Sequence, residues 1–179
     1  MYAKVDEIKA FLSKHRDKPF ISCEYTHAMG NSCGAMFKYT DLADEEPLYQ
    51  GGFIWDFVDQ GIWGTVKTGA GPQVRTLTYG GDYNNYDASD NNFNDNGVIS
   101  ADRRLTPHSY EVKHQYQNIW TELLDKNTGK IRVKNEKFFS DISNVRLCWE
   151  LLDGGEVVKS GTVEDVNVGP QQTREIDLN

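Results

Sequence analysis

Residues 20–31 read FISCEYTHAMGN and contain the feature around which the expected fold is organised. Phe20–Cys23 form a short apolar run after Pro19, which predicts a buried strand, and Glu24 comes where that strand ends. Burying a carboxylate costs free energy unless it is paired or hydrogen-bonded, so a glutamate here indicates chemistry rather than stability. In parallel α/β sheets and barrels, chemistry is placed at the carboxyl ends of strands. The simpler alternative is a solvated carboxylate at a strand end.

The elements around Glu24 alternate between helix and strand. Val5, Ile8 and Leu12 recur at helical spacing and predict an amphipathic helix over residues 5–15. After the strand we expect a helix over residues 31–43 and a second strand over 51–57, with Trp55 near its end. A strand, a helix and a strand in this order predict a parallel pair, so Glu24 and Trp55 should lie at the same end of the sheet.

The next segment mixes strand-forming residues with a long polar loop. Residues 61–81 combine β-branched residues with glycines and predict a hairpin. Residues 81–97, GDYNNYDASDNNFNDNG, are too rich in Asp and Asn for regular structure. The segment does not match the EF-hand calcium-binding loop. If Gly97 is placed at the sixth position of that loop, Arg103 falls at the twelfth, where a glutamate is required. The loop holds a ligand or is a series of solvated turns.

Thr106 and Pro107 form a helix start, and the helix is expected to continue to about residue 118. It contains one E-x-x-H pair, Glu111 and His114. Di-iron bundles need two such pairs and further glutamates, so a surface pair is the better interpretation.

After Trp120 the pattern changes to short alternating runs separated by turns. These runs predict antiparallel strands that form a sandwich, at residues 130–139, 145–152, 157–166 and 173–178. An immunoglobulin-like sandwich takes about 100 residues, so the remaining chain is too short for a complete one. A (β/α)8 barrel takes about 250 residues, so residues 1–118 are too few for a complete barrel. We therefore expect parts of two domains, at residues 1–118 and 119–179.

Longer motifs resemble a known family. ISCEYTHAMGNSCG (21–34) is followed by YQGGFIWDFVDQGIW (49–63), YGGDY (79–83), NNFNDNGVISADR (91–103) and TPHSYEVKHQYQ (106–117). These resemble, in order, signatures of the LacZ-type β-galactosidases of glycoside hydrolase family 2. The resemblance implies an α/β plus β fold: the C-terminal portion of a (β/α)8 TIM barrel, then a truncated immunoglobulin-like β-sandwich.

The resemblance also implies roles for individual residues. Glu24 matches the nucleophile of a retaining glycosidase, which works with a second carboxyl group about 5–5.5 Å away. Its ionised form needs hydrogen-bond donors, for which Tyr25 or a neighbouring group is a candidate. His27 matches a sugar-contacting residue and Trp55 the aromatic wall of the sugar site, although a lone histidine or a strand tryptophan is more often structural.

The polar loop is implicated by the same resemblance. Asp90, Phe93 and Asn96 match a loop that rearranges when substrate binds. Phe93 through its carbonyl and Asn96 through its side-chain oxygen match sodium ligands, and Asn96 is also expected to bind substrate; oxygen ligands suit a hard cation. The family's acid/base glutamate and magnesium ligands are expected before residue 1, so this chain alone should be catalytically incomplete.

Composition limits the remaining functions. A net charge of −8 over 179 residues argues against nucleic acid and anionic membrane surfaces as partners. No apolar run approaches the ~20 residues of a membrane span, and charges interrupt the start, MYAKVDEIKAFL, unlike in a signal peptide. Three cysteines (Cys23, Cys33 and Cys148) imply no disulfide framework, so we expect a reducing, cytoplasmic compartment. By resemblance, the full-length enzyme is expected to be a homo-oligomer.

Two functions stay open at this point. One is a segment of a retaining β-galactosidase that hydrolyses terminal β-D-galactosyl residues, as in lactose, through an intermediate on Glu24. The other is a noncatalytic carbohydrate-binding or structural module derived from such an enzyme. An intact motif around Glu24 favours the enzyme, because a binding module needs no nucleophile.

Overall fold

The structure, a computed structural model, describes residues 1–67, 69–91 and 93–178. The chain divides into two compact units, Met1–Tyr116 and Gln117–Asn179, which are described separately below. Among the described residues, no helix has the length and apolar character needed to cross a bilayer.

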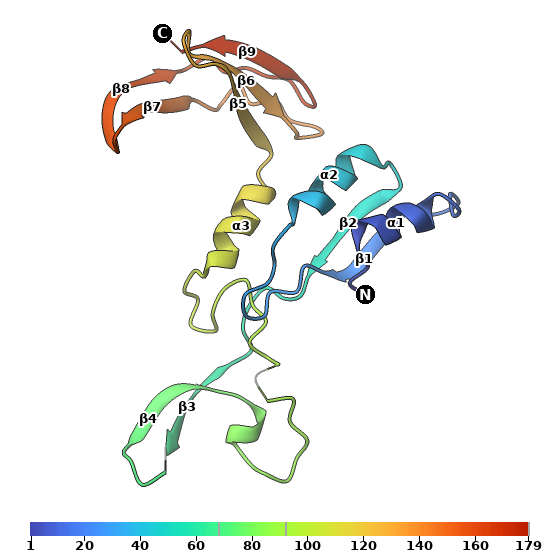
Figure 1. Cartoon of the computed structure of the whole chain (residues 1–179), viewed down its shortest axis with the longest axis vertical. Coiled ribbons are helices and arrows are strands. Elements are labelled where there is room, and N and C mark those ends of the chain that lie inside the picture. The colour runs from blue at the N-terminus through green and yellow to red at the C-terminus, as the bar shows by residue number, and fades with distance from the viewer. Residues whose placement is uncertain (68, 92, 179) are drawn as a thin grey trace. The chain divides into compact units, whose positions relative to one another are not determined.

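The first unit begins with two helices and two parallel strands: α1 (Val5–Leu12), β1 (Phe20–Tyr25), α2 (Phe37–Glu45) and β2 (Tyr49–Ile54) (Figure 1). The pairing of β1 with β2 is parallel, with Phe20 opposite Tyr49 and Tyr25 opposite Ile54. The predicted parallel pair is therefore confirmed. Because Glu24 lies near the end of β1 and Trp55 directly follows β2, both are at the carboxyl edge.

A core between the helices and the strands holds this arrangement together. Ile8 and Leu12 of α1, Leu42 of α2 and Tyr49 of β2 are almost completely buried, and Phe20 packs against them. Ile8 and Leu12 thus form the apolar stripe through which α1 packs on the sheet. Burying this apolar surface stabilises the unit.

The predicted start of the second helix is wrong. We expected a helix from residue 31, but α2 begins at Phe37. Cys33 and Ala35 have φ angles of 59° and 58°, in the left-handed region that L-residues seldom adopt and a right-handed helix excludes. The first helix also ends earlier than predicted, at Leu12.

The polar part of the unit follows as an excursion from β2. β3 (Ile62–Lys67) and β4 (Gln73–Thr78) form the predicted antiparallel hairpin, and a short 3-10 turn, η1 (Gly80–Asp82), opens the Asx-rich loop. The helix α3 (Pro107–Gln115) ends three residues before its predicted end. A second core joins this region to the start of the unit through Ala28, Cys33, Met36 and Val98, with Val112 of α3 packed against them.

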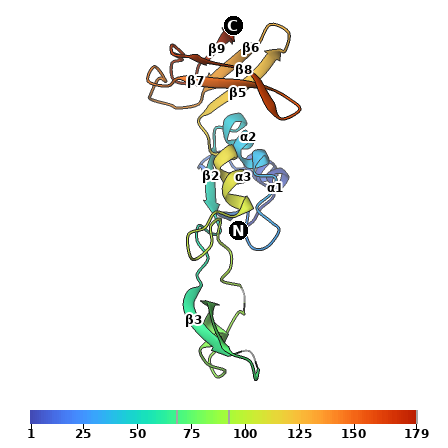
Figure 2. The same cartoon turned by 90° about the vertical axis from the view of Figure 1, so that its left-hand side faces the viewer.

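The second unit consists of antiparallel strands: β5 (Ile119–Asp125), β6 (Lys130–Asn135), β7 (Leu147–Asp153), β8 (Glu156–Val163) and β9 (Thr173–Asp177) (Figure 2). They form the sheets β5-β6-β9 and β7-β8. Ile131 and Val133 of β6 form a core to which Leu147 of β7 also contributes, as expected of a sandwich-like arrangement. The described residues of this unit contain five strands, one more than predicted, because β5 was missed.

Candidate active site

Glu24 has a hydrogen-bonding partner that the sequence did not indicate. The Tyr2 backbone N–H donates to the Glu24 carbonyl at 3.1 Å, and the Tyr2 phenol lies near the Glu24 carboxyl group. Partial burial and the neighbouring Glu24 raise the pKa of Tyr2 to about 12, so the phenol keeps its proton at neutral pH and can donate a hydrogen bond.

Tyr25, the donor considered from the sequence, does not serve Glu24. It is buried, its hydroxyl is hydrogen-bonded to the hydroxyl of Tyr116, and its ring packs edge-on against Tyr39 at 5.2 Å. Burial, with the Tyr116 contact, raises the pKa of Tyr25. Its role is to anchor β1 in the interior of the unit.

His27 lies beside Tyr2 and Phe93. The imidazole centroid is 5.7 Å from that of Tyr2 and 5.5 Å from that of Phe93, so residues distant in sequence meet here. The Met29 N–H donates to Nδ1 at 3.3 Å, which places the proton of the neutral ring on Nε2. Nε2 is buried and has no partner within the described residues. The ring therefore offers one N–H donor to a polar ligand.

Main-chain hydrogen bonds hold Trp55 next to the end of β1. Its N–H donates to the Tyr25 carbonyl at 3.4 Å, and its carbonyl accepts from Ala28 at 2.8 Å. The Trp55–Asp56 peptide is cis. Trp55 lines an open hollow of about 420 Å³, together with Asp90, Phe93 and Asn96 of the polar loop. The structure therefore brings these four predicted residues to one place.

Main-chain pairing explains how the polar loop reaches Trp55. Residues 56–60 run alongside residues 94–99: the Asp56 N–H donates to the Asn96 carbonyl at 2.9 Å, and the Gln60 N–H donates to the Asn94 carbonyl at 2.8 Å. Val58 and Ile99 form a parallel bridge between the two segments. This pairing places the end of the polar loop next to the residues that directly follow β2.

Asn96 is the most deeply placed member of the hollow, with 1% of its surface exposed. Its amide nitrogen donates to the Phe93 carbonyl, while its Oδ1 is buried and finds no partner in the described part of the chain. A buried oxygen of this kind calls for a donor or a cation. Nearby, burial and the charge of Asp59 raise the pKa of Asp95.

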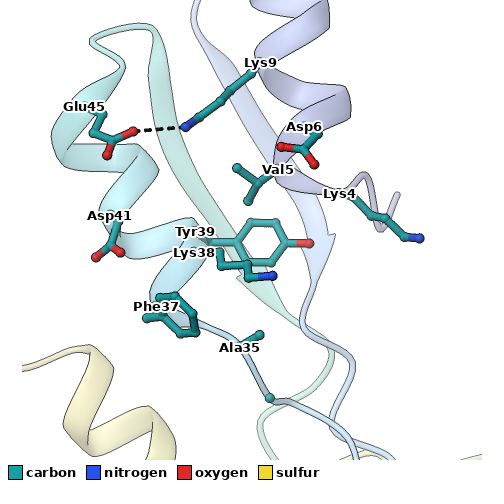
Figure 3. Close-up of a pocket in the computed structure, with 11 residues that line it drawn as sticks. Lys4, Val5, Asp6, Lys9, Ala35, Phe37, Lys38, Tyr39, Asp41 and Glu45 are labelled. Carbon is teal, nitrogen blue, oxygen red and sulfur yellow. Dashed lines mark hydrogen bonds and ion pairs between the residues drawn. The ribbon is translucent and has the colours of Figure 1, made fainter.

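Other acidic groups and hollows do not join this site. Glu45 pairs with Lys9 at 3.1 Å, Glu46 pairs with Arg16 at 2.8 Å, and Glu111 accepts from Gln115 at 3.3 Å. A separate hollow of about 460 Å³ between α1 and α2 is crossed by the Lys9–Glu45 pair and is lined by none of the predicted site residues (Figure 3). In the described residues, no group of three or more His, Cys, Asp or Glu side chains could hold a metal ion.

Comparison with known families identifies this arrangement. Residues 1–121 match the model described as "Glycosyl hydrolases family 2, TIM barrel domain". The chain belongs to glycosyl hydrolase family 2. Residues 131–179 match the model described as "Beta-galactosidase, domain 4", so both units have counterparts among family 2 proteins.

Several relatives in family 2 are named Beta-galactosidase. The chain is 40% identical over 178 residues to one from Clostridium acetobutylicum, covering 99% of this chain and 19% of the relative. It is 43% identical over 173 residues to one from Halalkalibacterium halodurans, covering 96% of this chain and 16% of the relative. A third, from Priestia megaterium, is 38% identical over 178 residues, with 99% and 17% covered. The chain thus spans less than one fifth of the length of these family 2 relatives.

Proposed function

We propose that the chain is a segment of a retaining β-galactosidase and that Glu24 is its nucleophile. The observation that carries this proposal is the position of Glu24 at the carboxyl end of β1, at the same edge of the sheet as Trp55. The names of the family 2 relatives support terminal β-D-galactosyl residues as the substrate. In this proposal residues 1–118 are the C-terminal part of a TIM barrel, and residues 119–179 begin an immunoglobulin-like sandwich.

The chemistry assigned to these residues is a double displacement. A Glu24 oxygen attacks the anomeric carbon and the bond to the leaving oxygen breaks, while a second carboxyl group outside this chain protonates that oxygen. Water then attacks the glycosyl–Glu24 ester and releases the sugar with retained configuration. The Nε2–H of His27 would donate to a sugar hydroxyl, and the Trp55 indole would pack on the apolar C–H face of the sugar.

The polar loop fits a hard cation such as sodium. The Phe93 carbonyl and the Asn96 side chain are already in contact, and Asn96 Oδ1 is buried without a partner among the described residues. These neutral oxygens suit a monovalent hard cation, which would help to hold the sugar in place. The described residues contain no acidic cluster that fits magnesium, and no step is assigned to it here.

The substitution Glu24→Gln tests the proposal in the full-length enzyme. It removes the attacking oxygen with little change of shape, so turnover should fall by roughly 10³-fold or more while sugar binding survives. A 2-deoxy-2-fluoro galactoside, which slows release of the intermediate, should label Glu24 covalently, as located by peptide mass spectrometry. Glu45→Gln, the same change in a surface ion pair, is the control and should retain activity.

Two results would oppose this assignment. One is a label on another carboxylate, and the other is near-normal turnover by Glu24→Gln. Sugar binding with no turnover in the unaltered full-length protein would favour the noncatalytic module instead.

A further inference from the structure

Asn96 can act on a ligand only if its deeply buried side chain is held in one orientation, and the flexible residue Gly97 follows it directly. Only glycine fits at position 97, because a Cβ there would lie 2.1 Å from the Asp59 backbone N and 2.4 Å from the Ile99 carbonyl oxygen. Glycine has the greatest backbone freedom of any residue. The close packing of Gly97 against the Asp59 backbone therefore requires a flexible residue directly after Asn96.

Main-chain hydrogen bonds restrain the neighbours of this flexible residue. The Asn96 carbonyl accepts from Asp56 at 2.9 Å, and the Val98 N–H donates to the Asp56 carbonyl at 2.9 Å. Neither of these two hydrogen bonds involves the Gly97 N–H, which belongs to the peptide between Asn96 and Gly97. That N–H donates instead to a side chain, the Oδ1 of Asp59, at 2.7 Å.

Asp59 is well placed to act as this anchor. It is half-buried, and its own N–H donates to the Ile99 carbonyl at 3.0 Å, which fixes its backbone against the segment it holds. A hydrogen bond from an N–H to a carboxylate is shorter and about twice as strong as one between neutral groups. The donor is the peptide group between Asn96 and Gly97. This hydrogen bond therefore limits backbone rotation next to Asn96 and so restricts the direction of the Asn96 side chain.

We propose that Asp59 is a positioning residue, which holds Asn96 in the wall of the hollow by accepting the Gly97 N–H. The role rests on the proposed function for Asn96, namely contact with a cation and the sugar. Asp59 itself touches neither ligand. Outer groups that orient a ligating side chain typically change metal affinity by about 10- to 100-fold when they are removed.

Sodium binding, measured without turnover, is the test. Full-length enzyme carrying Glu24→Gln is titrated with sodium chloride by calorimetry at constant ionic strength, with galactose affinity as a second measurement. Adding Asp59→Ala should weaken sodium binding by roughly 10-fold or more, with a smaller loss for galactose. Asp87→Ala removes an exposed carboxylate of the polar loop that accepts from Asn84 of that loop, and it is the matched control.

Two conservative variants separate position from charge, and they decide the matter even if Asp59→Ala does not fold. Asp59→Asn keeps an acceptor oxygen in the same place without the charge, so it should keep a weaker hydrogen bond to the Gly97 N–H and lose clearly less sodium affinity than Asp59→Ala. Asp59→Glu keeps the charge but moves the acceptor by one methylene group and should resemble Asp59→Ala.

The opposite ranking, with Asp59→Glu normal and Asp59→Asn impaired, would show that charge matters rather than the hydrogen bond, and would overturn the proposal. Unchanged sodium affinity in all three folded variants would overturn it as well. Neither result depends on turnover, so the assignment of Glu24 as nucleophile stands or falls separately.

Discussion

At the scale of single residues, the Tyr2 phenol beside Glu24 offers a direct test of the proposed nucleophile. Tyr2→Phe removes the hydroxyl near Glu24 and keeps the ring against His27. In the full-length enzyme we expect kcat to fall roughly 10²-fold, the usual effect of losing one preorganised donor, with a smaller change in KM. Steady-state kinetics on a galactoside measures both, and an unchanged kcat would remove Tyr2 from the site.

The raised pKa of Tyr2 predicts a pH dependence of stability. Its folded pKa of about 12 lies above the ordinary tyrosine value of 10.0, so the folded state keeps a proton that the unfolded state loses first. The resulting stabilisation is complete below pH 10 and disappears as the pH rises toward 12. The melting temperatures of the parent and Tyr2→Phe should differ by a constant amount from pH 6 to 9 and converge above pH 10. A difference that stays constant to pH 12 would contradict this.

The sequence predicted some site residues and missed others for physical reasons. Glu24 and Trp55 were identified because each falls where an apolar strand ends, and parallel pairing then brings them to one edge. Tyr2 precedes the first helix with no periodic pattern around it, so only the folded chain reveals its contact with Glu24. Asp59 was missed likewise, since its partner, Gly97, is returned to it by the pairing of two irregular segments.

At the scale of elements, Gly52 controls the fit of β2 against β1. A Cβ at this position would lie 2.7 Å from Ser22 Cβ and 2.9 Å from the Ser22 carbonyl oxygen. Gly52→Ala should therefore destabilise the protein by roughly 1–3 kcal/mol, as overpacking does. Gly34→Ala is the control because no atom lies within 4 Å of its added carbon. Urea denaturation compares the two, and equal stabilities would argue against a tight strand contact.

The presence and start of an element were predictable where side-chain periodicity determines them. Ile8 and Leu12 indicated α1, and the alternation of Ile131 and Val133 indicated β6, because these residues form the cores, but the predicted ends at residues 15 and 139 lie beyond the observed ends at Leu12 and Asn135. The residues before α2 were misassigned, since left-handed φ values at Cys33 and Ala35 leave no mark on the apolar pattern. β5 was missed because its sequence, IWTELLD, does not alternate cleanly and its burial pattern does not either.

At the scale of the whole molecule, apolar side chains on the parallel strands remain exposed. Ile21 of β1 and Phe53 of β2 are 55% and 66% exposed, and Phe57, shortly after β2, is 71% exposed. A two-stranded sheet with such a surface is marginal by itself, so the 179-residue chain expressed alone should self-associate. Sedimentation velocity should show association that rises with concentration. A monomer with one sharp melting transition would contradict this expectation.

A charge substitution locates the surface responsible for this association. Phe53→Lys places a charge on the exposed strand face and should reduce association. Tyr86→Lys places the same charge on a loop residue that is 82% exposed, and it should leave association unchanged. Equal effects of the two variants would mean that net charge, rather than the strand face, governs the association.

The pairing of residues 56–60 with 94–99 also has a consequence for engineering. Gln60 and Asn94, which lie on either side of the hairpin and of most of the polar loop, are joined by a 2.8 Å hydrogen bond. The intervening β3–β4 hairpin is thus a side branch closed at its base, and lengthening such a loop costs only about 0.6 kcal/mol per doubling of its length. A fluorescent domain with adjacent termini, spliced in after Ala70 in the turn of the hairpin, should leave Trp55 and Asn96 in place. This turn is therefore an insertion point for building a reporter of ligand binding at the hollow.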